Sequence, residues 1–148
     1  MVHALQEAWR VLRAHSLLID LRPAIEHGRV GLDRDGYLAI QWAMRESLAS
    51  YRAASRSLAM AEALKLFAPR TSSRFSCTTV FPSVEDLEDW LHDWYEAESA
   101  GHADNLVRRV EKTSKQPEFT GKIIAKVPFM LKVLTKRDAK PLDRKSVV

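Results

Sequence analysis

The chain has 148 residues and a net charge of +4; 46% of its residues are hydrophobic and 28% are charged. These values are typical of a globular protein with a sizeable core, and the length predicts one domain. No apolar run approaches the roughly 20 residues of a membrane helix, and the first residues do not resemble a secretory signal. The single cysteine, Cys77, excludes an internal disulfide. We therefore expect a cytoplasmic protein that makes no membrane contact.

The charge is unevenly distributed along the chain. Ser83 to Glu98 is acidic, whereas the stretch from Lys122 onward is strongly basic. Such a split is found in nucleic-acid-binding proteins, but it also arises when two solvated faces carry opposite charge. The basic residues interleave with a predicted strand and carry no known nucleic-acid motif. The second interpretation is therefore favoured, and nucleic acid is an unlikely partner.

The chain begins with a predicted amphipathic helix followed by a strand, together spanning Ala4 to Pro23. Leu5, Ala8, Trp9 and Leu12 recur at the spacing of one buried helix face. The strand Leu17–Leu21 is apolar on both faces, as expected for a strand that helices cover on both sides. A helix followed closely by such a strand is the repeating unit of a parallel α/β sheet.

A hairpin and a long helix are predicted next. After a loop over Ala24–Gly28, the runs Arg29–Leu32 and Tyr37–Trp42 flank an Asp-Gly turn, which indicates a β-hairpin. A helical pattern covers Arg45–Phe67, and Pro69 is expected to end it.

The middle of the chain alternates and then becomes helical. Over Arg74–Phe81 the residues at odd positions share one face, predicted to point inward, so Cys77 is expected to be an inert core thiol. Ser83 is predicted to cap a helix from Val84 to about Ser99. A second helix is expected over roughly His102–Lys115.

The last predicted element is a long strand over Gly121–Lys136, in which Pro128 implies a bulge or a local edge. Arg137–Val148 is polar and patternless and is expected to be a disordered basic tail. Together these elements predict an α/β fold in which helices flank a mixed sheet of about four to five strands. The single domain would span residues 1–136.

The opening stretch resembles a family. Ala4–Arg13 reads ALQEAWRVLR and Leu17–Pro23 reads LLIDLRP. These segments resemble the helix ALxEAxRVLRPGG and the fifth strand LLxDLRP of class I S-adenosylmethionine-dependent methyltransferases, which are Rossmann-like. The resemblance implies that the chain corresponds to the C-terminal half of such an enzyme. That half continues with a helix, a sixth strand, and a seventh strand running antiparallel between the fifth and sixth. Arg45–Phe67, Arg74–Phe81 and Gly121–Lys136 can fill these three places.

The cofactor-binding motifs of that family are missing from these residues. The family binds S-adenosylmethionine with a glycine-rich loop after its first strand and an acidic residue at the end of its second. None of the five glycines here forms a GxGxG or GxGxxG group, and Ala14-His15-Ser16 replaces Pro-Gly-Gly before the strand. We therefore expect no cofactor for the chain alone, and S-adenosylmethionine only if a partner supplies the binding half.

Three residues near the end of the first strand are weak candidates for catalysis. Asp20 and Arg22 lie where open α/β sheets place their ligands, and His27 in the following loop can act as a general base. The alternative is that Asp20 and Arg22 form an ion pair that ties the strand end to Glu26 or to a helix terminus.

The acidic helix carries two pairs at i, i+4 spacing: Glu88 with His92, and Asp89 with Asp93. Metal sites use such spacing. These residues lie on the polar face of the predicted helix, however, which favours a solvated acidic surface. We expect no metal site, and we expect Trp90 and Trp94 to be packing or interface residues.

Three functions remain open. The first is a methyltransferase-related, non-catalytic domain that forms a homodimer through Leu17–Leu21, because no segment here matches the fourth strand that lies beside the fifth in the family. The second is a subunit that completes a split methyltransferase, with Asp20, Arg22 and His27 lining the acceptor side. The third is a basic module that binds nucleic acid. Its basic residues would be Lys122, Lys126, Lys132, Lys136 and Arg137.

Overall fold

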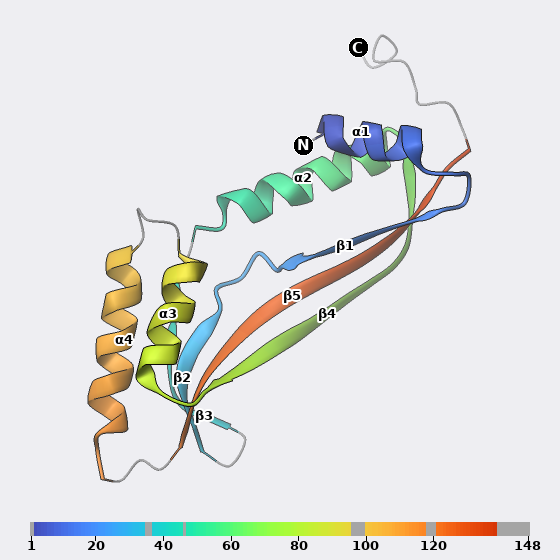
Figure 1. Ribbon diagram of the computed structural model, residues 1–148. Coiled ribbons are helices and arrows are strands. Elements are labelled where there is room, and N and C mark those ends of the chain that lie inside the picture. Colours follow the sequence, from blue (N-terminus) through green and yellow to red (C-terminus); the bar gives the residue numbers. More distant parts are fainter. Residues whose placement is uncertain (1, 35–36, 46, 96–99, 118–120, 139–148) are drawn as a thin grey trace. The chain divides into compact units, whose positions relative to one another are not determined.

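The computed structural model describes residues 2–34, 37–45, 47–95, 100–117 and 121–138 (Figure 1). Within them the chain forms four helices and five strands, so the predicted α/β class is confirmed. The elements, in chain order, are α1 (Val2–Val11), β1 (Leu17–Pro23), β2 (Arg29–Arg34), β3 (Tyr37–Ala43), α2 (Ala49–Ala63), β4 (Phe67–Phe81), α3 (Val84–Trp94), α4 (Ala100–Ser114) and β5 (Lys122–Lys136).

β5 is the central strand of the sheet. Its residues Phe129–Thr135 pair antiparallel with β1, and Lys122–Lys126 pair antiparallel with β2, which also pairs antiparallel with β3. Pro128 falls between the two ladders, where its missing N–H breaks no hydrogen bond to β1 or β2.

β4 pairs with β5 as well. Within the first unit β1 occupies one edge of Phe129–Thr135, so β4 takes the other edge and β5 lies between β1 and β4 (Figure 1). The Arg137 N–H donates to the Leu66 carbonyl (3.1 Å) and the Phe75 ring stacks on Phe129 (6.0 Å), so β4 runs antiparallel to β5. Each pairing within the described strands is thus antiparallel, and the predicted mixed sheet is wrong on this point.

The chain divides into two compact units. The first unit comprises Met1–Ile25, Leu48–Phe75 and Phe129–Val148, and the second comprises Glu26–Ser47 and Ser76–Pro128. Each has its own buried core.

The core of the first unit lies between its two helices and one face of its strands. Leu58 and Ala61 of α2 and Leu134 of β5 are buried there, with Leu66 and Phe67 between them in sequence. The predicted apolar face of α1 packs against this cluster, and α1 and α2 contact each other (Figure 1). The residues that pack on it are Leu5, Trp9, Leu12, Leu18 and Leu64.

β1 is covered on one face only. Leu18 packs on the core cluster. Leu17, Ile19 and Leu21 point to the opposite face, where 45%, 64% and 58% of each residue is exposed. The expectation that helices cover this strand on both sides is therefore wrong.

α2 ends earlier than its helical pattern predicts. Lys65 has a positive φ of 57°, and the Leu66 N–H returns to the Ala61 carbonyl at 3.0 Å, which closes the helix by Ala63. β4 then begins at Phe67, so Pro69 lies inside a strand instead of ending a helix. An edge strand tolerates proline because its outward N–H needs no partner.

β4 is also more exposed than predicted. Only its terminal residues Phe67 and Phe81 are buried, whereas Phe75 is 41% exposed and Cys77 is exposed. Cys77 is therefore not a core thiol. Alternation correctly groups residues by face, but it does not show whether another layer covers that face.

The second unit joins the β2–β3 hairpin to α3 and α4. The predicted hairpin is confirmed, although its turn residues Asp35 and Gly36 lie outside the described residues. Ser83 caps α3 as predicted, with its Oγ accepting the Asp86 N–H at 3.1 Å. Apolar residues of both helices are buried, among them Leu87, Leu91, Leu106 and Val110.

The predicted tail is described only at its start. Arg137 accepts a hydrogen bond from the Trp9 indole N–H at its carbonyl, and Asp138 lies 3.2 Å from His15 Nε2. Residues 139–148 lie outside the described part of the chain. Among the described helices, none is both long and apolar enough to span a bilayer.

Candidate functional site

Asp20 and Arg22, predicted from the sequence, lie together in the first unit. Arg22 Nε is 3.1 Å from Asp20 Oδ2, and both side chains are largely buried. That carboxylate oxygen is close to the guanidinium without hydrogen-bond geometry. Arg22 also donates from Nη1 to the Tyr51 carbonyl (3.4 Å) in the first turn of α2. The pair thus ties the end of β1 to a helix terminus.

A shallow hollow of about 160 Å³ opens beside Arg22. Arg74 from β4 and Ser55 from α2 also line it, together with Met130 and the segment Pro23–Ile25. Two guanidinium groups and a hydroxyl suit an anionic ligand better than a metal cation.

The third candidate, His27, belongs to the second unit. It is exposed in the segment between β1 and β2 and makes polar contacts of its own.

Two of the basic residues considered for nucleic-acid binding have structural partners inside the first unit. Lys132 of β5 forms an ion pair with Glu62 of α2. Lys136 donates to the Leu12 carbonyl, and its ammonium lies 4.6 Å from the centre of the Trp9 ring. Through these contacts the two ammonium groups bind α1 and α2 to β5. Lys132 and Lys136 are therefore less available to an anionic partner.

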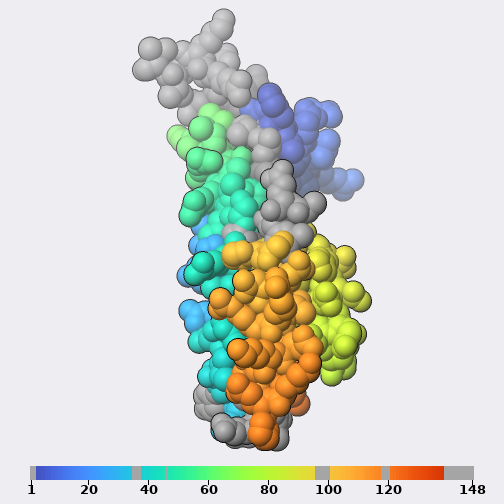
Figure 2. All heavy atoms as spheres, turned by 90° about the vertical axis from the view of Figure 1, so that its left-hand side faces the viewer, coloured from blue at the N-terminus to red at the C-terminus, as the bar shows by residue number. Residues whose placement is uncertain are grey.

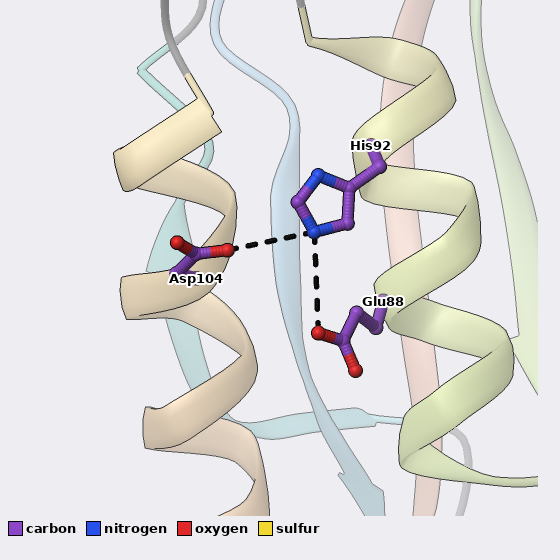
Figure 3. A group of neighbouring side chains, drawn as sticks. All are labelled: Glu88, His92 and Asp104. Carbon is purple, nitrogen blue, oxygen red and sulfur yellow. Dashed lines mark ion pairs between the residues drawn. The ribbon is translucent and has the colours of Figure 1, made fainter. Parts of the chain in front are cut away.

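The second unit contains a group of three side chains, of which the sequence pointed to two. Glu88 and His92 project from neighbouring turns of α3, as their spacing implies, and Asp104 of α4 approaches the same imidazole (Figure 3). Asp104 is 12 residues downstream on another helix, so no local pattern points to it. Trp90 of α3 stacks on Trp94 (5.1 Å between ring centres) and packs in a tilted arrangement against Phe81 (5.4 Å), in agreement with the predicted packing role of the two tryptophans.

A second hollow of about 320 Å³ lies in the second unit between β3 and α4. Arg45, His102 and Arg109 line it, and Arg109 Nε is held at 2.8 Å by the Asn105 side chain. This hollow is not predictable from the sequence, because only the Asn105–Arg109 spacing within α4 is visible there.

Comparison of the chain with protein-family models, with curated proteins and with solved structures gave no match.

Proposed function

We propose that this chain is a methyltransferase-related domain that does not bind S-adenosylmethionine alone and acts without catalysis, by forming a homodimer through β1. The proposal rests on one observation, the unpaired edge and exposed apolar side chains of β1. It pairs with β5 on one edge, no described strand pairs with its other edge, and three of its apolar side chains are exposed.

The strand order supports the relationship to methyltransferases. The resemblance predicts a seventh strand antiparallel between the fifth and the sixth, and β5 lies antiparallel between β1 and β4. A helix precedes β1 and another lies between β1 and β4 in the chain, as the resemblance also expects. The β2–β3 hairpin stands outside this correspondence.

The exposed face of β1 carries no charge. Leu17, Ile19 and Leu21 lie opposite Thr135, Val133 and Leu131 of β5, so these six side chains share one face. The charged residues of the two paired segments, including Asp20, Arg22 and Lys132, alternate onto the other face. A surface that is apolar and uncharged is complementary to a copy of itself, which favours a second copy of this chain as the partner.

Two-fold symmetry restricts how two β1 strands can pair. Antiparallel pairing centred on Ile19 places Ile19 opposite itself and Leu17 opposite Leu21 of the second copy, all on the exposed face. Each such pair contributes about 0.2–1 kcal/mol. Centring on Asp20 would place two carboxylates opposite each other, which is destabilising. We therefore assign the two-fold axis to Ile19.

Light scattering coupled to size exclusion tests the proposal. At micromolar concentration the unmodified chain is expected to elute with twice its monomer mass of 16.8 kDa. Ile19→Lys places two like charges at the axis and should yield a monomer. Met60→Lys is the matched control, because Met60 is a similarly exposed hydrophobic residue of α2 in the same unit. A monomeric unmodified chain, or equal loss of the dimer in both variants, would reject the proposal.

The same open edge favours a second candidate, a subunit of a split methyltransferase. In the resembled fold, the edge of the fifth strand receives a parallel strand from the half that carries the glycine-rich loop. Asp20 and Arg22 of the first unit would then serve the methyl acceptor. Calorimetric titration of S-adenosylmethionine into the chain, alone and mixed with candidate partner halves, tests whether the chain completes a split methyltransferase. Absence of binding heat in each mixture would rule this candidate out.

A further inference from the structure

The contact between α3 and α4 brings polar side chains from both helices close together. The two helices contact each other, and they lie side by side in Figure 2, where α4 is orange and α3 yellow. Leu87 and Leu91 of α3 and Ala103 and Leu106 of α4 are buried. Glu88, His92 and Asp104 are neighbours of these buried residues in sequence, so packing restrains their backbones while about half of each side chain remains exposed.

One ring nitrogen faces both carboxylates. His92 Nε2 lies 3.9 Å from Glu88 Oε1 and 3.4 Å from Asp104 Oδ1 (Figure 3). The three ligand atoms lie within 4.8 Å of one another. Arg108, one turn after Asp104 on α4, donates to the Asp104 backbone carbonyl (3.3 Å) and does not hydrogen-bond the carboxylate.

The two separations of His92 Nε2 from the carboxylate oxygens are longer than in a direct hydrogen-bonded ion pair and closer to those between two ligands of one cation. Charge-assisted hydrogen bonds between nitrogen and oxygen measure about 2.7–2.9 Å, shorter than either contact of His92. Ligand bonds of about 2.0–2.2 Å in a tetrahedral zinc site place neighbouring ligand atoms about 3.3–3.6 Å apart. The two nitrogen–oxygen separations of 3.4 and 3.9 Å lie in or within a few tenths of an ångström of that range. The two carboxylate oxygens lie within 4.8 Å of each other, so rotation of the Glu88 side chain toward Asp104 would complete the geometry.

We propose that Glu88, His92 and Asp104 bind one zinc ion that links α3 to α4. An imidazole nitrogen with two carboxylates suits a borderline metal such as Zn²⁺, whereas Mg²⁺ and Ca²⁺ prefer six or more oxygen ligands. Two carboxylates and a neutral imidazole carry a charge of −2, which the dication balances. The fourth position faces solvent and takes water. The site lies within the second unit and does not depend on the β1 interface.

Calorimetric titration with ZnCl₂ in a non-coordinating buffer tests this proposal. The chain should carry Cys77→Ser, because the exposed thiol is a competing zinc ligand. One zinc ion per chain is expected. His92→Ala and Asp104→Asn should each weaken binding by at least about tenfold, since each removes a ligand. Asp93→Asn should bind zinc within about twofold of the parent, because this exposed acid on α3 is not in the group.

Two further measurements distinguish a built site from loose surface binding. Co²⁺ should produce the visible absorption bands of a tetrahedral ion in the parent and not in His92→Ala. Zinc should raise the melting temperature of the parent and of Asp93→Asn but not of His92→Ala, while Mg²⁺ should raise none of them. Absence of binding at millimolar zinc, or binding that His92→Ala leaves unchanged, would overturn the proposal.

Discussion

Gly31 of β2 shows how one residue sets a strand pairing. A Cβ at this position would lie 2.0 Å from the Ile40 carbonyl oxygen of β3 and 2.9 Å from the Gln41 Cα. Both are backbone atoms, so no side-chain rotation can relieve the overlap. Any larger residue must therefore push the two strands of the hairpin apart.

We predict that Gly31→Ala destabilises the protein by about 2–4 kcal/mol, because it strains a paired backbone. Gly101→Ala is the matched control, since its Cβ would meet nothing within 4 Å and alanine favours the helix in which it lies. The control should keep or slightly raise the free energy of unfolding. Urea titration followed by circular dichroism measures both; equal stability of the two variants would contradict this view of the hairpin.

Cys77 gives a second residue-level prediction. Because its side chain lies on the exposed strand β4, it should react fully with a thiol reagent such as DTNB in the folded protein. Absorbance should show about one thiol per chain without denaturant. A thiol that reacts only after unfolding would mean that another layer covers β4.

Ser83 and Cys77 show what sequence patterns reveal about single residues. The Ser83 cap was predictable because its partner, Asp86, is three residues away. The exposure of Cys77 was not, because alternation assigns residues to faces and says nothing about neighbouring layers. The same limit applies to the Glu88–His92–Asp104 group, of which only the i, i+4 pair was visible.

Among the helices and strands, α3 has the clearest local sequence signal for its start, the N-cap residue Ser83. Ser83 Oγ accepts the Asp86 N–H at 3.1 Å and lies 2.7 Å from Asp86 Oδ2, to which its hydroxyl donates. Glu85 and Asp86 in the first turn also face the positive end of the helix dipole.

Ser83→Ala should therefore lower the free energy of unfolding by about 1 kcal/mol, because it leaves a helix N–H without its cap. Ser73→Ala, on the exposed part of β4, should change stability by less than about 0.5 kcal/mol. Denaturant titrations of both variants give the comparison, and an unchanged midpoint for Ser83→Ala would show that the cap contributes nothing.

Element boundaries were less predictable than element types. The apolar spacing of α2 continues past its observed end at Ala63, since Leu64, Leu66 and Phe67 remain in the core after the backbone has turned into β4. Tertiary packing, not helical periodicity, holds these last residues. β4 likewise begins seven residues before the predicted strand start at Arg74, because Pro69 in the sequence is typical of a break.

For the molecule as a whole, local sequence patterns predicted the elements and the β2–β3 hairpin, but not the pairing of β5 with β1, β2 and β4. Each strand pair in the described sheet is antiparallel, although the opening helix and strand resemble a unit of a parallel sheet. Pairing depends on residues more than a hundred positions apart, such as Leu18 and Leu134, which no local pattern connects. Among the described strands, none pairs with the second edge of β1, and three apolar side chains of β1 are exposed.

Disulfide formation at Ile19 tests the homodimer most directly. Residues opposite each other in antiparallel strands have Cα atoms about 4.5–5.5 Å apart, within the range that a disulfide spans. Ile19→Cys combined with Cys77→Ser should therefore form a covalent dimer under mild oxidation, visible by non-reducing electrophoresis. Met60→Cys in the same background should form no covalent dimer and should run as a monomer on the same gel. If Ile19→Cys forms no more covalent dimer than Met60→Cys, β1 does not pair with itself around Ile19 and the account of this protein as a β1-mediated homodimer is wrong.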